Sequence, residues 1–358
     1  MVKVKNDDVV RTEVEFEILE EIGAHEGRNA EVYRVHDLYV DEIRAAKRID
    51  GGDFSDYKEY YQEARQMTDA RHPNVVPVYF CGLDSSGDTD DVWILMEYYG
   101  EGSLGALHQS RQLRVEEIVE IGVQLLTGLA YIHGEGLLHF DLKPSNVLFR
   151  DDGIATITDF GLAERVDSYG VAESDGFYRP YVPPEALAGN KQTVETDIYH
   201  VGLTLWRLCN TPTEWRHEVQ SAQPIGNAVM NGNFPDRDTF LPHIPDRLRR
   251  VIKKATKVNP DDRYNTAREM MNDLGEVKKY LAWQMRRSGS DSGFMDWVRK
   301  TEEKEVRCQI LENGDSFEVK TQKTVNTTQH IRDACKGGIN SLPSAIRFVK
   351  NSIRQHLS

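Results

Sequence analysis

The sequence predicts an α+β protein with a small β-rich lobe, a larger α-rich lobe and a small α+β extension at its C-terminal end. Up to about residue 98, apolar and polar residues alternate as in half-buried strands, and beyond that point apolar residues recur three or four positions apart as in helices. A Ser/Gly-rich stretch at 288–292 then predicts a linker. We expect a tail at 1–13, a main unit at 14–283 with lobes at 14–98 and 99–283, and an extension at 284–358.

The composition is that of a globular protein. Of the 358 residues, 39% are hydrophobic and 28% are charged, which are ordinary values for a folded domain. No window approaches the roughly 18 apolar residues of a membrane-spanning helix, and the charged N-terminus lacks the apolar core of a signal peptide. We therefore expect no membrane span and a cytoplasmic location. The four cysteines form no CxxC pair, so neither a zinc site nor a disulfide framework is predicted.

The charge is unevenly distributed along the chain. The net charge of −14 argues against a protein that coats nucleic acid, and no nucleic-acid partner is expected. From Gln284 onward, thirteen Lys and Arg stand against nine Asp and Glu, a net of +4, so residues 1–283 carry −18. A solvated basic face is the simplest explanation of this excess. The alternatives are that the extension docks on the acidic main unit, binds a partner protein, or touches nucleic acid or membrane.

The apolar pattern predicts the individual elements in order. Strands are expected at 14–22, 31–35, 44–49 and 92–98, and a helix at 57–70. A helix at 115–133 is followed by short strands at 146–149 and 155–158, and then by helices up to about Trp283. In the extension, segments 305–311 and 316–320 flank Asn313-Gly314, the strongest short signal for a β-hairpin. The last expected element is an amphipathic helix from about Ser344.

The most informative segment is His-Phe-Asp-Leu-Lys-Pro-Ser-Asn at 139–146, and Asp159-Phe160-Gly161 begins thirteen residues after Asn146. Phosphoryl transfer depends on positioning and on charge neutralisation more than on covalent help. It needs a carboxylate facing the incoming hydroxyl, a cation near the transferred group, and oxygen ligands for magnesium. Asp141, Lys143, Asn146 and Asp159 are the residue types that these roles require.

These two motifs resemble those of the eukaryotic-like serine/threonine protein kinase family, H-R-D-L-K-P-x-N followed by D-F-G, and the resemblance covers about residues 16–280. It implies the bilobal protein kinase fold, ATP and Mg²⁺ as cofactors with Mn²⁺ as an alternative metal, and protein substrates phosphorylated on serine or threonine. Under it, Asp141 accepts the proton, Lys143 balances the developing charge, and Asn146 and Asp159 hold the metal.

The resemblance also assigns residues of the β-rich lobe. Lys47 is similar to the strand lysine that binds the α- and β-phosphates, and Glu63 to its ion-pair partner. Met96 is similar to the residue that borders the adenine pocket, and Glu97 and Tyr99 would offer backbone hydrogen bonds to adenine. The residues expected to sandwich the base are Ile22, Val32, Ala45 and Leu148. Gly23, Gly27 and Ala30 are placed over the phosphates, in a loop that departs from G-x-G-x-x-G by two inserted residues and an alanine.

The family pattern implies two structural contacts. The sequence also departs from the pattern at two further positions. Glu185 is expected to pair with Arg263, and Asp197 to hold the loop at 139–146. Phe140 replaces the arginine that usually precedes the catalytic aspartate, so a phosphorylated residue in segment 159–185 loses one charged partner. Tyr178 stands where these kinases usually carry a threonine.

Three functions are compatible with this pattern. The first is an active serine/threonine protein kinase of the kind that lacks the arginine before the aspartate. The second is a pseudokinase, a regulatory nucleotide-binding scaffold, but such proteins typically lose Lys47, Asp141 or Asp159, which are all present. The third is a small-molecule kinase, against which Glu185 and Arg263 argue, because they resemble features of kinases with protein substrates.

Overall fold

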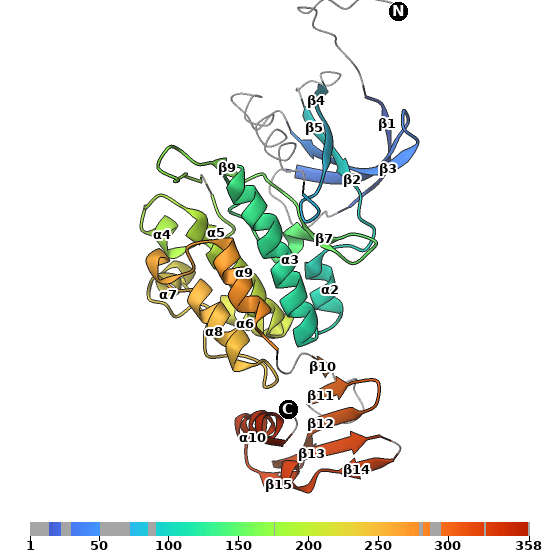
Figure 1. Ribbon diagram of the computed structural model, residues 1–358, viewed down its shortest axis with the longest axis vertical. Coiled ribbons are helices and arrows are strands. Elements are labelled where there is room, and N and C mark those ends of the chain that lie inside the picture. The colour runs from blue at the N-terminus through green and yellow to red at the C-terminus, as the bar shows by residue number, and fades with distance from the viewer. Residues whose placement is uncertain are drawn as a thin grey trace, which may run out of the picture. The chain divides into compact units, whose positions relative to one another are not determined.

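The computed structural model describes residues 14–22, 30–50, 72–84, 91–174, 176–278, 282–286, 295–325 and 327–356. It divides into two compact units, the first comprising Met1–Arg71 with Val76–Tyr99 and the second His72–Val75 with Gly100–Ser358. Figure 1 shows strands in the first unit, and a helical part followed by a second sheet in the second unit. The expected helix at 57–70 lies outside the described residues.

The first unit contains an antiparallel five-stranded sheet in the order β1-β2-β3-β5-β4. Its strands are β1 (Phe16–Glu21), β2 (Ala30–Asp37), β3 (Glu42–Ile49), β4 (Val78–Asp84) and β5 (Asp91–Glu97). The four strands expected from the sequence are confirmed, and β4 was not expected. Val35, Ala46 and Leu95 form the buried core of one face, with Phe16 and Trp93 packed against it. The alternation that predicted the strands therefore also places their apolar residues on a common face.

The second unit begins with a helical part. Its helices are α2 (Leu104–Ser110), α3 (Val115–Gly134), α4 (Pro184–Leu187), α5 (Val194–Leu208), α6 (Pro212–Ser221), α7 (Ile225–Met230), α8 (Asp246–Ala255) and α9 (Ala267–Gly275). The short strands β6 (Leu137–Leu138) and β9 (Glu164–Arg165) pair with each other, as do β7 (Val147–Phe149) and β8 (Ala155–Ile157). The helix at 115–133 and the strands around 147 and 155 are confirmed.

Helix α5 is the central element of this part, because nearly all of its residues are buried. Gly202 of α5 lies against the end of α8, where an added Cβ would lie 2.7 Å from Thr256 Cγ2 and 2.9 Å from Ala255 Cβ. Only glycine permits that separation without displacement of the neighbouring helix. The buried α5 is thus fixed against its surroundings, and side chains on its inner face have defined positions.

The extension is a twisted antiparallel sheet with one helix. Strands β10 (Trp283–Arg286), β11 (Met295–Lys300), β12 (Glu305–Asn313), β13 (Ser316–Thr324) and β14 (Thr328–His330) are adjacent in that order, and β15 (Lys336–Ile339) also pairs with β13. The predicted hairpin is confirmed, with Gly314 at a φ of +60° in the turn. The final helix, α10 (Leu342–His356), is confirmed and begins two residues before Ser344. Val306, Ile310, Val319 and Ile353 are fully or almost fully buried in this part of the chain.

One expectation for the segment before the extension is wrong. Helices were expected to continue to about Trp283, but α9 ends at Gly275 and Trp283 is the first residue of β10, opposite Arg299. Trp283 and Met285 are buried and alternate with Gln284 and Arg286, a period of two that is typical of a strand. None of the helices in the described ranges has the length and apolar character needed to span a membrane.

Candidate active site

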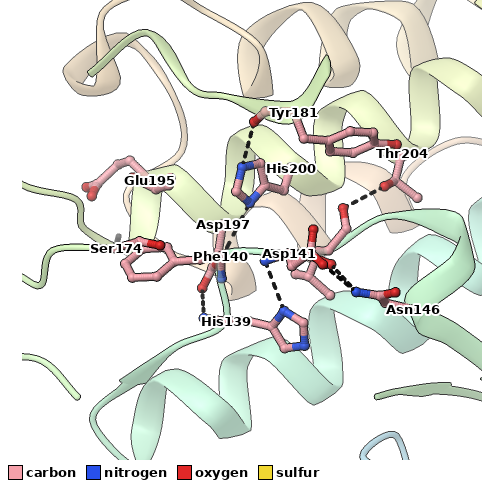
Figure 2. A network of polar contacts seen from close by, with 12 residues as sticks. His139, Phe140, Asp141, Asn146, Ser174, Tyr181, Glu195, Asp197, His200 and Thr204 are labelled. Carbon is pink, nitrogen blue, oxygen red and sulfur yellow. Dashed lines mark hydrogen bonds and ion pairs between the residues drawn. The ribbon is translucent and has the colours of Figure 1, made fainter. Parts of the chain in front are cut away.

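The loop at residues 139–146, called here the catalytic loop, is held by a carboxylate from α5. Asp197 is fully buried; its Oδ2 accepts the backbone N–H of His139 at 2.9 Å and its Oδ1 that of Phe140 at 2.7 Å (Figure 2). The predicted role of Asp197 is therefore confirmed. Phe140 has a φ of +64°, an unfavourable conformation for a non-glycine residue that persists only where the surroundings fix it.

Asp197 keeps its negative charge despite complete burial. Burial by itself raises the pKa of a carboxyl group, but the hydrogen bond from His133 Nε2 at 2.8 Å and the nearby histidines outweigh it, so the pKa of Asp197 is lowered. His133 was not singled out from the sequence. It lies 64 positions from Asp197, and a histidine in the last turn of a helix gives no sequence signal for such a contact.

Within the catalytic loop, Asp141 has two chemically different oxygens. Its Oδ2 accepts hydrogen bonds from Lys143 Nζ at 2.7 Å and from Asn146 Nδ2 at 2.8 Å. Its Oδ1 is buried and has no hydrogen-bond partner among the described residues. Figure 2 shows Asp141 and Asn146 directed toward one another. One oxygen is thus fixed by two side chains of the loop, and the other has an unused acceptor position.

The two predicted metal ligands belong to neighbouring segments. Asn146 uses its amide nitrogen for Asp141, which leaves the amide oxygen as the donor for a metal. The backbone carbonyl of Asn146 accepts the N–H of Thr158 at 3.0 Å, and Asp159 follows immediately with a φ of +64°. Among the described residues, no group of three or more His, Cys, Asp or Glu is arranged to hold a metal. An amide and a carboxylate oxygen fit Mg²⁺, which prefers hard oxygen ligands and takes the remainder from phosphates and water.

A second buried carboxylate lies at the end of the segment 159–185. Glu185 accepts two hydrogen bonds from Arg263, at 2.9 and 2.8 Å, and a third from Thr196 Oγ1 at 2.7 Å. Burial tends to raise the pKa of Glu185, but the Arg263 guanidinium outweighs it and lowers that pKa. The predicted pair is confirmed. The Thr196 contact was not foreseen, because nothing in the local sequence distinguishes this threonine.

Phe140 is fully buried in an apolar group, here called the Phe140 cluster. Its ring lies edge-on to that of Phe177, with the centroids 5.8 Å apart. The members of the cluster are Leu138, Phe140, Ala172, Leu162, Val166, Phe177 and Val194. Ala172 also exchanges two backbone hydrogen bonds with Gln192, at 3.0 and 2.9 Å. These apolar contacts and the backbone bridge between Ala172 and Gln192 therefore hold the segment 159–185, although the motif has no arginine at position 140.

In the first unit, several predicted nucleotide-binding residues share one face of the sheet. Lys47 on β3 is opposite Val32 on β2 and Ile94 on β5, and Ala45 is opposite Met96. Lys47, Ala45 and Met96 are buried. The period of two along each strand puts these side chains on a common face. The remaining base-pocket residue, Leu148, lies on β7 in the second unit.

The other predicted residues of the first unit are less fully determined. The N–H of Ile22 donates to the carbonyl of Val32 at 2.7 Å, and that of Glu97 to the carbonyl of Pro77 at 3.1 Å. Tyr99 lies two residues beyond β5 and is half-buried. Ala30 is the first residue of β2. Three predicted positions, Gly23, Gly27 and Glu63, lie outside the described residues.

Comparison with known proteins identifies relatives of this chain. The probable serine/threonine-protein kinase PknB of Lactococcus lactis is 28% identical over 267 residues, which cover 72% of this chain and 41% of that protein. The serine/threonine-protein kinase PrkC of Bacillus subtilis is 28% identical over 272 residues, covering 72% and 40%. For the serine/threonine-protein kinase PknL of Mycobacterium tuberculosis the values are 28% over 262 residues, covering 72% and 64%. The chain thus spans about two fifths of the length of the first two relatives.

A family model described as a protein kinase domain matches residues 16–274. This range contains both predicted motifs, the buried Glu185–Arg263 pair and the sheet that bears Lys47. The chain therefore belongs to the protein kinase family.

Proposed function

We propose that this chain is an active protein kinase that transfers the γ-phosphate of ATP to serine or threonine hydroxyls of protein substrates. The observation that carries the proposal is the arrangement around Asp141, whose Oδ2 is fixed by Lys143 and Asn146 while its Oδ1 has no partner among the described residues. An acceptor hydroxyl needs such a fixed carboxylate oxygen to receive its proton. The relatives, which are named as serine/threonine-protein kinases, support the same function.

In this proposal each residue has one task. Asp141 Oδ1 accepts the hydroxyl proton, and the Lys143 ammonium, 2.7 Å from Asp141 Oδ2, balances charge on the transferred phosphoryl group. Lys47 binds the α- and β-phosphates, with Glu63 as its ion-pair partner. Mg²⁺ would be held by Asn146 and Asp159, and when bound it neutralises charge on the phosphates.

The adenine site is also part of the proposal. The base is sandwiched by Ile22, Val32, Ala45 and Leu148, beside Met96, and it bonds to the backbone of Glu97 and Tyr99. Gly23, Gly27 and Ala30 cover the phosphates.

Incubation of the full chain with labelled ATP, Mg²⁺ and bulk histone tests the proposed activity. Wild type is expected to label the histone on serine or threonine, and Asp141→Ala, the matched control, is expected not to. A pseudokinase would bind nucleotide without any transfer, and a small-molecule kinase would label an added amino-alcohol but no protein. Either result would contradict the proposal. Buried Glu185 and Arg263, which resemble protein-substrate kinase features, favour the protein substrate.

The proposal extends to regulation, which we place outside phosphorylation of the segment 159–185. In kinases with arginine at the position of Phe140, added phosphate supplies a partner for that cation and orders the segment. Here the Phe140 cluster and the Ala172–Gln192 bridge order the segment without a cation at position 140, and Lys191 adds exposed ion pairs to Asp167 and Glu173. Substantial activity is therefore expected when Ser168, Tyr169, Ser174 and Tyr178 bear no phosphate.

The test of this regulation is phosphatase treatment of the purified chain, with mass spectrometry to show that the segment is bare, followed by the histone assay. Phe140→Arg is the matched variant, because it restores the missing cation and removes the buried ring. It is expected to lower the activity of the bare protein and to make activity depend on phosphate. A bare wild-type protein that stays inactive until one of the four residues is rephosphorylated would refute this view.

The extension is proposed to dock on the helical part of its own chain. The support comes from two contacts: an ion pair between Arg354 on α10 and Asp246 on α8, and a hydrogen bond of 2.6 Å from Gln284 Nε2 to the carbonyl of Gln112. The basic excess of the extension against −18 for the rest favours the same contact. Binding of a partner protein is the alternative.

Cutting the chain after Lys278 tests this docking, because β10 begins at Trp283 and a cut at or beyond that residue would separate part of β10 from the sheet. The separate extension, if it docks, is expected to bind the shortened chain in trans, less tightly as salt is raised. Arg354→Glu is expected to weaken that binding, and Arg286→Glu, which bears an exposed charge elsewhere on the extension, serves as its control. Equal binding by both variants would contradict the assigned contact.

A further inference from the structure

The ring of Tyr178 lies over the lysine of the catalytic loop. Its centroid is 5.2 Å from Lys143 Nζ, within the roughly 6 Å over which an aromatic face attracts a cation. The same ammonium donates to Asp141 Oδ2 at 2.7 Å. The catalytic lysine therefore has two partners, a carboxylate and a ring. The threonine usual at position 178 in similar kinases has no ring to offer.

The position of this ring is determined by the residues on both sides of it. The carbonyl of Tyr178 accepts the N–H of Tyr181 at 2.7 Å, and the two rings are 6.1 Å apart between centroids. Tyr181 is fully buried. On the other side, Phe177 packs on Phe140 at 5.8 Å. The backbone at Tyr178 is thus fixed at both ends, and the ring, which is 50% exposed, is held against Lys143 without being part of the core.

The burial of Lys143 gives this contact its strength. Lys143 is only 9% exposed, and cation–π attraction is larger for a desolvated cation than for one in water. The four-carbon stem of lysine is flexible, so a single ion pair with Asp141 leaves the ammonium free to turn about that oxygen. A second contact, with a fixed ring, limits this rotation. It also keeps the ammonium beside the carboxylate of Asp141.

We propose that Tyr178 is a positioning residue, whose aromatic face keeps the Lys143 ammonium in place for phosphoryl transfer. The proposal rests on the kinase activity proposed above and adds a residue to it. The ring holds the cation that balances charge developing during the reaction. Loss of the ring therefore lowers kcat and changes the KM for ATP little.

Two substitutions separate the ring face from the rest of the side chain. Tyr178→Phe removes the hydroxyl and keeps the face, so near wild-type kcat is expected. Tyr178→Leu keeps apolar bulk and removes the face, and kcat is expected to fall about three- to thirtyfold, the range that corresponds to a cation–π contact. The full chain is assayed with bulk histone and Mg-ATP, and thermal unfolding midpoints establish that each variant is folded. If Tyr178→Leu does not fold, Tyr178→Met is used instead.

The same change in a Lys143→Ala background distinguishes positioning from a general structural effect. With no ammonium to hold, Tyr178→Leu is expected to cause no further loss, measured under single-turnover conditions with protein in excess over ATP. A ring that only shaped the segment would lower the rate in both backgrounds by the same factor, which would overturn the proposal.

The outcomes also separate this inference from the proposed function. If wild type transfers no phosphate, so that it is equal to Asp141→Ala, the kinase activity itself is wrong and the role of Tyr178 falls with it. If wild type is active but Tyr178→Leu keeps its kcat, or Tyr178→Phe loses as much as Tyr178→Leu, the activity stands and the positioning role is refuted.

Discussion

Replacement of Arg263 by methionine is expected to lower the free energy of unfolding by about 3–5 kcal/mol, because it leaves a buried carboxylate without its cation. Glu185 is 5% exposed and Arg263 is 2% exposed, so water cannot replace the lost partner. Among the described residues, the carboxylate would keep the hydrogen bond from Thr196 Oγ1, 2.7 Å long, and a backbone hydrogen bond from Glu185 itself. The expected loss therefore lies in the range for broken buried ion pairs. It is well above the contribution of a surface ion pair, which is about 0–1 kcal/mol.

The double variant Glu185→Leu/Arg263→Met is the matched control. It removes both charges, so part of the lost stability is expected to return. Recovery is incomplete, because Arg263 also donates to the carbonyls of Lys257, Glu195 and Val258, and each lost hydrogen bond is worth about 1 kcal/mol. Thermal unfolding followed by circular dichroism measures the difference, at about 1–2 °C for each kcal/mol in a protein of this size.

Acid provides an independent test of the same pair. The folded-state pKa of Glu185 is lowered by Arg263, in spite of the burial that raises it. A carboxyl with a lowered folded pKa stabilises the folded state above its unfolded pKa, and this stability is lost as the pH falls through the folded value. Wild type is therefore expected to lose stability on acidification more steeply than the double variant. An Arg263→Met protein within about 1 kcal/mol of wild type, or no less stable than the double variant, would refute the reasoning.

Three further outcomes are expected. Asp141→Ala and Asp159→Ala should each lower kcat for histone by about a hundredfold or more, since one removes the proton acceptor and the other a metal ligand; near-normal turnover in either would contradict the site. Lys47→Met should abolish transfer without lowering the unfolding midpoint, and wild-type activity would disprove its role. Gly202→Val should lower the free energy of unfolding by about 1–3 kcal/mol, because its Cβ meets Thr256 and α8 at 2.7 Å; denaturant titration measures it, and an unchanged midpoint would show that α8 can shift.

Much of this fold could be predicted because local patterns and long-range contacts agree. The alternation in β2, β3 and β5 is also what buries one face of the sheet, and Asn313-Gly314 needs only its own backbone conformation to turn the chain. The end of the helical part was predicted wrongly at Trp283, because a four-residue strand is too short for its period to compete with the helical pattern before it. Its assignment depends on β11, which lies beyond an intervening segment.

The residues of the candidate site also differ in whether the sequence could predict them. Asp141, Lys143 and Asn146 were predictable because one short loop carries them, and their spacing already brings them together. His133 and Thr196 were not, because each acts through contact with a residue made adjacent only by folding. Sequence patterns report neighbours along a strand or helix turn, whereas these hydrogen bonds join separate elements packed around α5.

Two departures from the family pattern place aromatic side chains in or beside one segment. Phe140 stands in place of an arginine and Tyr178 in place of a threonine, and both are adjacent to or paired with ring-bearing residues of one segment, Phe177 and Tyr181. A segment ordered by charge pairs responds to added phosphate and weakens as salt screens the pair. Apolar burial has neither property, since it depends on area removed from water. The burial of the Phe140 ring therefore favours a segment whose order does not depend on added phosphate, as the regulation proposed above requires.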